Sequence, residues 1–222
     1  MLDELSEADI KFLRDCYEEN SKKQFHRISA RRNEDRRNYH NDKEKGLVVR
    51  WQDCVPLERW YRKTFDLGRA SFGGQLGIIK QPLGVHADIL WDVPNHVTRS
   101  EHCTTSYSVL ETDCIDTLHT YIFDQYVDRD KWTGLKDGIE SIHGLVETKV
   151  LHGYPHEAGR LAHLYPNAKA LGLTIKEKLP LPIGKIVSWP SHHLHSGQDF
   201  KSAGGSWKLH LTLITQTSLI NG

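Results

Sequence analysis

The feature that most constrains the fold is a strict alternation of polar and apolar side chains over residues 207–213, within the segment 207–215. In an extended strand, successive side chains point to opposite faces, so this segment predicts a β-strand with two different faces. The polar face can line the wall of a pocket, or it can meet water as half of an exposed strand. Leu209, Leu211 and Leu213 lie on one face, and Lys208, His210 and Thr212 lie on the other.

Other segments also indicate strands. Residues 73–85 contain an apolar run bounded by glycine and proline, which suits a strand that enters a loop. Residues 184–189 also predict a strand, and a glycine-rich connection leads from them to the segment at 207–215. We therefore expect these two segments to pair antiparallel, within a fold that is mainly β with flanking helices.

The helices are expected on the outside of the sheets. Ser6 and Asp9 have the spacing of a capping box, and apolar side chains follow at helical spacing, so the chain is expected to open with an amphipathic helix. Residues 56–65 predict a second, short helix. We expect one domain over residues 1–222, with a helical N-terminal buttress at 1–70, a β core at 73–217 and a helical insert at about 155–172.

Three residues are candidate metal ligands. His195 ends the strand region that begins at residue 184, and His86 and Asp88 follow directly after the apolar run at 73–85. A second His-x-Asp pattern, at His40 and Asp42, lies in a charged stretch, and we interpret it as solvated. Two imidazoles and one carboxylate can form the facial triad of a non-heme Fe(II) site, which leaves one face of the metal open for a bidentate cosubstrate and O2.

Two further histidines lie next to His195. Along an extended chain His193 has the same parity as His195, whereas His192 points to the opposite side. A one-residue bulge would change which of these rings faces the core. The residues alone leave His193 open as an alternative to His195.

Taken together, these segments resemble the Fe(II)/2-oxoglutarate-dependent oxygenases over roughly residues 73–217, and especially uncharacterised members from microbial and viral genomes. The resemblance implies a double-stranded β-helix, or jelly-roll and cupin-like, core. It also implies that His86, Asp88 and His195 hold the iron. The matching residues are His86 and Asp88, Tyr121-Ile-Phe-Asp-Gln125, Trp189 with Leu194 and His195, and the strand that begins at Lys208.

The same resemblance implies an enzyme that uses Fe(II), 2-oxoglutarate and O2. It would hydroxylate a small-molecule or peptidyl substrate and release succinate and CO2. Lys208 would bind the distal carboxylate of 2-oxoglutarate, and His210 or Thr212 would add a hydrogen bond. Many relatives have Arg at the position of Lys208, and often Ser or Thr at that of His210, so a single ammonium here replaces a bidentate guanidinium. Tyr107 could also hydrogen-bond the cosubstrate, or it could be a buried aromatic residue whose hydroxyl is satisfied locally.

Two other classes of function stay open. Residues 22–37 carry seven basic and two acidic side chains, which would suit a nucleic-acid-modifying oxygenase. The same stretch is also typical of a solvated helix, which we favour because the whole chain is neutral, with 29 Lys and Arg against 29 Asp and Glu. A non-catalytic jelly-roll protein that binds a metal or a metabolite would use the same His-Asp-His set.

The chain shows no Cys-x-x-Cys pair, no secretion signal and no apolar stretch long enough to span a bilayer. We therefore expect a cytoplasmic protein that is not resident in a membrane. Residues 123–132 pass from an apolar strand into a charged, aromatic segment that ends at Trp132. This segment could cover the metal pocket and select substrate, or it could be an ordinary surface loop.

Overall fold

The computed structural model of the protein describes residues 3–30, 48–70, 72–80, 85, 87–88, 103–127, 142–143 and 173–216. Four of the sequence predictions fall outside these residues, namely the metal ligand His86, the solvated pair His40 and Asp42, the loop around Trp132 and the helical insert at 155–172. The side chains of the basic stretch at 22–37 fall outside them too.

Both predicted helices of the N-terminal region are present. Helix α1 spans Glu7–Ala30 and begins with the expected capping box. The Asp9 N–H donates to Ser6 Oγ (3.1 Å), and the Ser6 N–H donates to Asp9 Oδ2 (3.3 Å). Helix α3 spans Val55–Thr64 and has a proline in its first turn, where a missing N–H leaves no hydrogen bond unmade.

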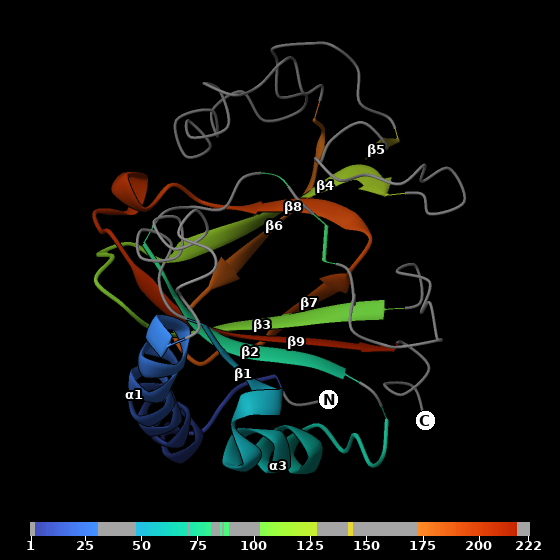
Figure 1. Ribbon diagram of the computed structural model, residues 1–222. Helices are drawn as coiled ribbons and strands as arrows, with labels where there is room; N and C mark the ends of the chain where they lie inside the picture. The colour runs from blue at the N-terminus through green and yellow to red at the C-terminus, as the bar shows by residue number, and fades with distance from the viewer. Residues whose placement is uncertain are drawn as a thin grey trace.

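The strands form two antiparallel sheets that face each other (Figure 1). The larger sheet has the order β1-β2-β9-β3-β7. In the smaller sheet β4 lies between β6 and β8, and β5 pairs with the end of β4. The bounds are β1 (Val48–Arg50), β2 (Phe72–Ile79), β3 (Cys103–Thr112), β4 (Leu118–Val127), β5 (Ile142–His143), β6 (Ile175–Leu181), β7 (Val187–Pro190), β8 (His193–Gly197) and β9 (Lys208–Gln216).

The chain passes from one sheet to the other several times, as a jelly roll requires. Strands β6 and β8 belong to the smaller sheet, whereas β7 and β9 belong to the larger one, so these four consecutive strands alternate between the layers. The two helices lie beyond the larger sheet, on the side away from the smaller one (Figure 1). The prediction of a mainly β, jelly-roll fold with flanking helices is therefore confirmed.

Two details of the predicted arrangement are wrong. The segment at 184–189 contributes β7, but β7 does not pair with β9, because β3 lies between them and is antiparallel to both. The reason is that the chain leaves the larger sheet after β7 to form β8, and an alternating pattern specifies the faces of a strand but not its neighbours. In addition, Val48–Arg50, within the segment predicted as a helical buttress, forms the edge strand β1.

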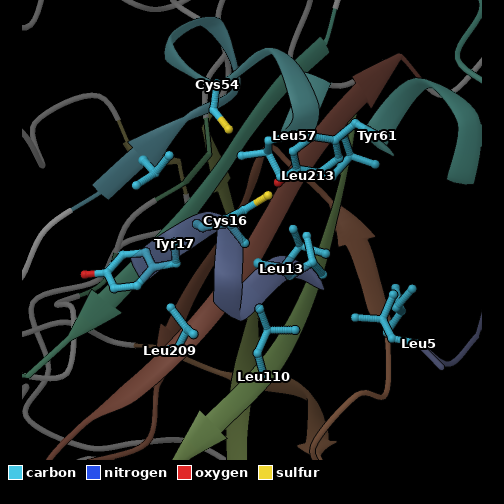
Figure 2. Close-up of a cluster of buried hydrophobic side chains, with 14 of the residues drawn as sticks. Leu5, Leu13, Cys16, Tyr17, Cys54, Leu57, Tyr61, Leu110, Leu209 and Leu213 are labelled. Carbon is cyan, nitrogen blue, oxygen red and sulfur yellow. The ribbon is translucent and has the colours of Figure 1, made fainter. Parts of the chain in front are cut away.

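Strand β9 is buried on both faces, and its two faces have different surroundings. Its leucines are 2–3% exposed and belong to the core between the larger sheet and the helices. Figure 2 shows side chains of α1, α3, β3 and β9 meeting in this core. The members that come from the helices are Leu13, Cys16 and Tyr17, which follow helical spacing on α1, and Leu57 and Tyr61 of α3.

A polar contact also fixes α3 to the sheet. The Tyr61 hydroxyl lies 2.9 Å from the carbonyl oxygen of Thr212 and 3.2 Å from that of Gln75, two residues that pair directly across β2 and β9. The Tyr61 ring approaches β2 so closely that a Cβ at Gly74 would lie 2.8 Å from it. Glycine at this position therefore allows the helix to pack against the sheet.

Among the described residues, no helix has the length and apolar character needed to cross a membrane.

The packing of α1 predicts a specific loss of stability. Leu13 is completely buried, so Leu13→Ala should lower the free energy of unfolding by about 3 kcal/mol through lost apolar burial and a residual cavity. Denaturant unfolding would measure this loss. Ile115→Ala is the matched control, because Ile115 is 86% exposed and its truncation should change stability by less than about 0.5 kcal/mol. Equal effects of the two substitutions would contradict the described packing.

Candidate functional site

A pocket lies between the two sheets, and the predicted polar face of β9 forms one of its walls. The side chains of Lys208, His210 and Thr212 are all less than 10% exposed, so this face does not meet water as half of an exposed strand. Strands β2, β3 and β7 add to this wall, and β4, β8 and the 3₁₀ turn η7 (Phe200–Ala203) form the opposite side. The lining residues are Gln75, Ile79, Asp88, Tyr107, Thr120, Trp189, His195, Gly197, Phe200, Lys208, His210 and Thr212.

Two of the three predicted metal ligands meet at this pocket. The Nε2 atom of His195 lies 3.4 Å from Oδ2 of Asp88. His195 comes from β8 in the smaller sheet, whereas the backbone N–H of Asp88 donates to the carbonyl of Ser191, in the turn that joins β7 to β8 (3.0 Å). His86 lies outside the described residues, and within those residues no group of three His, Cys, Asp or Glu side chains comes together.

His193, the alternative to His195, has other partners. Its Nδ1 atom lies 2.8 Å from the carbonyl oxygen of Phe123, so Nδ1 carries the proton and donates. Its Nε2 atom lies 3.3 Å from Nζ of Lys176. The pairing of β8 with β4 is irregular between these two histidines, as a bulge would produce. Despite this irregularity, it is His195 that lies beside Asp88.

Lys208 is a buried cation, and none of the described residues provides it with a counter-ion. Its side chain makes no hydrogen bond or ion pair within the described part of the chain. Instead its Nζ atom lies 4.9 Å from the centroid of the Tyr107 ring and 5.6 Å from that of Phe200, so aromatic faces provide its main favourable contacts. Burial lowers the pKa of Lys208 to about 8, because the charged form loses its hydration.

Polar atoms of two neighbouring rings are also unsatisfied. The Tyr107 hydroxyl and the His210 Nδ1 atom are buried, and neither has a hydrogen-bond partner among the described residues. The two rings stack with their centroids 5.1 Å apart. Burial, reinforced by the charge of Asp88, raises the pKa of Tyr107 well above its usual value, so the phenol keeps its proton. Burial and the charge of Lys208 lower the pKa of His210 to about 3, so the imidazole is neutral.

These groups are suited to an anionic ligand. An unpaired polar group in a buried site costs free energy. Among the described residues, the Lys208 ammonium, the Tyr107 hydroxyl and the His210 Nδ1 atom all lack a hydrogen-bond partner, so this pocket is not optimised for stability alone. A carboxylate would accept hydrogen bonds from Lys208 and Tyr107 and would compensate the buried charge. Imidazole and carboxylate donors such as His195 and Asp88 suit several divalent metals, including Fe(II). The described residues therefore supply two side chains of the kind that bind a divalent metal, Asp88 and His195, and two donors suited to a carboxylate, Lys208 and Tyr107.

Sequence reasoning missed several residues that shape the pocket. Gln75 and Ile79 lie on β2 opposite Thr212 and Lys208, so the sheet register brings them to the same wall. Gly197 faces the lysine from the other sheet, where an added Cβ would lie 3.6 Å from Nζ. The alternation within β2 could have identified Gln75, but Gly197 depends on the contact between the sheets.

Comparison with known proteins gives the following result. No protein family model matches the chain, and no curated protein matches it. Among solved structures, the chain is similar to the non-heme alpha ketoglutarate dependent carbocyclase SnoK from nogalamycin biosynthesis, with 14% identity and a TM-score of 0.48 over 96% of this chain and 76% of that chain.

Two further similarities are weaker. An L-ribose isomerase of Cellulomonas parahominis has 12% identity and a TM-score of 0.33, over 77% of this chain and 60% of that chain. Procruciferin, an 11S globulin from Brassica napus, has 8% identity and a TM-score of 0.34, over 79% of this chain and 26% of that chain. Similarities at these levels do not establish a family or an activity for this chain.

The burial of Lys208 predicts an unusual effect of pH on stability. Lys208→Met should stabilise the protein at pH 7, because methionine fills a similar volume without a buried charge. The pKa of Lys208 falls from 10.5 to about 8 on folding. Between pH 8 and pH 10.5 the unfolded chain therefore binds more protons than the native protein, so the free energy of unfolding increases as the pH rises through this range. The advantage of the variant should therefore shrink by about 3 kcal/mol between pH 7 and pH 10.5.

Denaturant unfolding of both proteins across this pH range would measure the difference. Other groups titrate in both proteins, so their contributions largely cancel in the comparison. A constant difference would mean that Lys208 is solvated or paired with an anion in the native protein.

Proposed function

We propose that the protein is an Fe(II)- and 2-oxoglutarate-dependent dioxygenase that hydroxylates a small-molecule or peptidyl substrate. The observation that carries the proposal is that Lys208, a cation with no ion-pair partner among the described residues, lies in the same buried pocket as the Asp88–His195 pair. A metal held by Asp88 and His195 would be chelated by one end of 2-oxoglutarate, and the ammonium of Lys208 would bind the carboxylate at its other end. The resemblance of the sequence to this oxygenase family supports the same assignment.

Five residues of the pocket have a defined role in this proposal. Asp88 and His195, together with His86, would hold the metal ion. Lys208 and Tyr107 would donate to the distal carboxylate of the cosubstrate, and the neutral ring of His210 would contribute a further polar contact. The burial of these side chains would exclude water from the reaction. When bound, Fe(II) and 2-oxoglutarate would activate O2 for insertion into a C–H bond of the substrate.

No observation favours the other two classes of function over this one. The nucleic-acid-modifying alternative depends on residues 22–37, whose side chains the structure does not describe. A non-catalytic metal or metabolite binder would use the same pocket, and it is distinguished by experiment.

The first test is the formation of the metal–cosubstrate complex. Fe(II) and 2-oxoglutarate added to the protein without oxygen should produce a visible metal-to-ligand charge-transfer band. His195→Ala should abolish the band, because a metal ligand is lost. Lys208→Met should preserve metal binding but require at least about tenfold more 2-oxoglutarate, because the charge-assisted hydrogen bond is lost.

His193→Ala is the matched control for His195→Ala. It removes an equally buried histidine of the same strand whose nitrogens bind Phe123 and Lys176 instead, so the band should persist. Tight metal binding without any band would contradict the proposal and would favour a non-catalytic cupin-like binder. Turnover of 2-oxoglutarate to succinate, measured with candidate substrates, would then define the activity.

The lowered pKa of Lys208 also predicts how cosubstrate affinity depends on pH. Only the protonated lysine attracts a carboxylate, so affinity should be nearly constant below about pH 7 and should weaken by about tenfold from pH 7 to pH 9. Calorimetric titration of 2-oxoglutarate into the Mn(II)-loaded protein would measure this change. Lys208→Arg keeps its charge throughout this range, so its affinity should not fall. An identical decline in both proteins would show that another group titrates.

A further inference from the structure

Two buried hydroxyls lie behind the metal-binding carboxylate. Thr105, on β3, and Ser191, in the turn between β7 and β8, are both completely buried. The Thr105 hydroxyl donates to Oδ2 of Asp88 (2.9 Å). Its oxygen also lies 2.8 Å from Oγ of Ser191. The three side chains therefore form a continuous hydrogen-bonded chain that ends on the carboxylate.

The number of available protons determines which group donates in each of these hydrogen bonds. Each hydroxyl has one proton to donate, and an ionised carboxylate can only accept. Because Thr105 donates its proton to Asp88, the Ser191 hydroxyl must donate to Thr105. Hydrogen bonds that point the same way polarise one another, and a charge at the end of the chain strengthens them further.

Backbone contacts join the same three residues. The Asp88 N–H donates to the Ser191 carbonyl (3.0 Å), and the Ser191 N–H donates to the carbonyl of Cys103 at the start of β3 (2.9 Å). Ser191 is thus bound to β3 and to Asp88, four residues before His195. The turn at Ser191, which leads into the strand of His195, is therefore hydrogen-bonded to Asp88.

We propose that Thr105 is a positioning residue that, with Ser191, fixes the carboxylate of Asp88 beside His195 before the metal binds. This inference rests on the proposed metal site and adds a residue to it. The fixed carboxylate loses little conformational entropy when the ion arrives, because Thr105 already restricts its rotation. The Oδ2 atom of Asp88 accepts a hydrogen bond from Thr105, and this bond fixes the orientation of the carboxylate relative to His195.

The inference is tested by metal affinity rather than by activity. Co(II) titration of the full-length protein, followed by the visible absorption of the bound ion, should show at least about tenfold weaker binding for Thr105→Val, which keeps the shape but lacks the hydroxyl. Thr105→Ser restores the hydroxyl and should bind Co(II) like the unaltered protein. Ser191→Ala should cause a smaller loss, and it should add nothing further to Thr105→Val, because the chain is already broken.

A second pair of hydroxyls, in which both residues lie on strands, provides a matched control. Ser106 and Ser188 lie 2.9 Å apart, across β3 and β7, but neither makes a described contact with Asp88. Ser106→Ala should therefore leave Co(II) affinity unchanged. The melting temperature of each metal-free variant shows whether it is folded, and if Thr105→Val does not fold, Ser191→Ala decides the question.

The outcomes separate this inference from the proposed function. If the unaltered protein binds Co(II) and Thr105→Val binds it equally well, the positioning role is wrong and the metal site stands. If Thr105→Ser binds as weakly as Thr105→Val, packing of the threonine methyl matters and the hydroxyl does not, which also overturns the inference. If the unaltered protein binds no divalent metal, the proposed function fails together with the inference.

Discussion

The structure depends on the burial of β9 on both faces. Its leucines pack into the core beneath α1 and α3, and its polar side chains face the pocket between the sheets. The apolar face provides the hydrophobic stabilisation that keeps the strand in the centre of the larger sheet. Burial of the charged Lys208 on the polar face lowers the stability of the fold. The burial of the leucines on the other face of the same strand offsets this cost.

This arrangement explains how far the sequence could predict the fold. Alternation over residues 207–213 was sufficient to assign Lys208 to Leu213 to their faces. The capping residues Ser6 and Asp9 correctly located the start of α1. The neighbours of each strand were not predictable in this way, because a period of two contains no information on pairing. The insertion of β3 between β7 and β9 depends on long-range contacts that are absent from the local pattern.

The candidate site shows a similar limit. The sequence singled out Asp88, Tyr107, His195 and Lys208, and the structure gathers all of them around one pocket, while His86 lies outside the described residues. It did not single out Thr105, because a threonine in a strand is common and its hydroxyl has a meaning only beside Asp88. The burial of the Tyr107 hydroxyl away from any hydrogen-bond partner in the described part of the chain likewise depends on the fold and not on the local sequence.

Helix α3 lies on the opposite side of the larger sheet from the pocket, yet it contacts the backbone that forms the pocket wall. The Tyr61 hydroxyl reaches the carbonyls of Gln75 and Thr212, whose side chains line the pocket. Tyr61 therefore supports the backbone of the pocket wall from the opposite face of the sheet, where it cannot contact a ligand in the pocket. A change of ligand preference, in evolution or by directed mutagenesis, is consequently constrained by the helical layer, and libraries aimed at new specificity should vary both layers together.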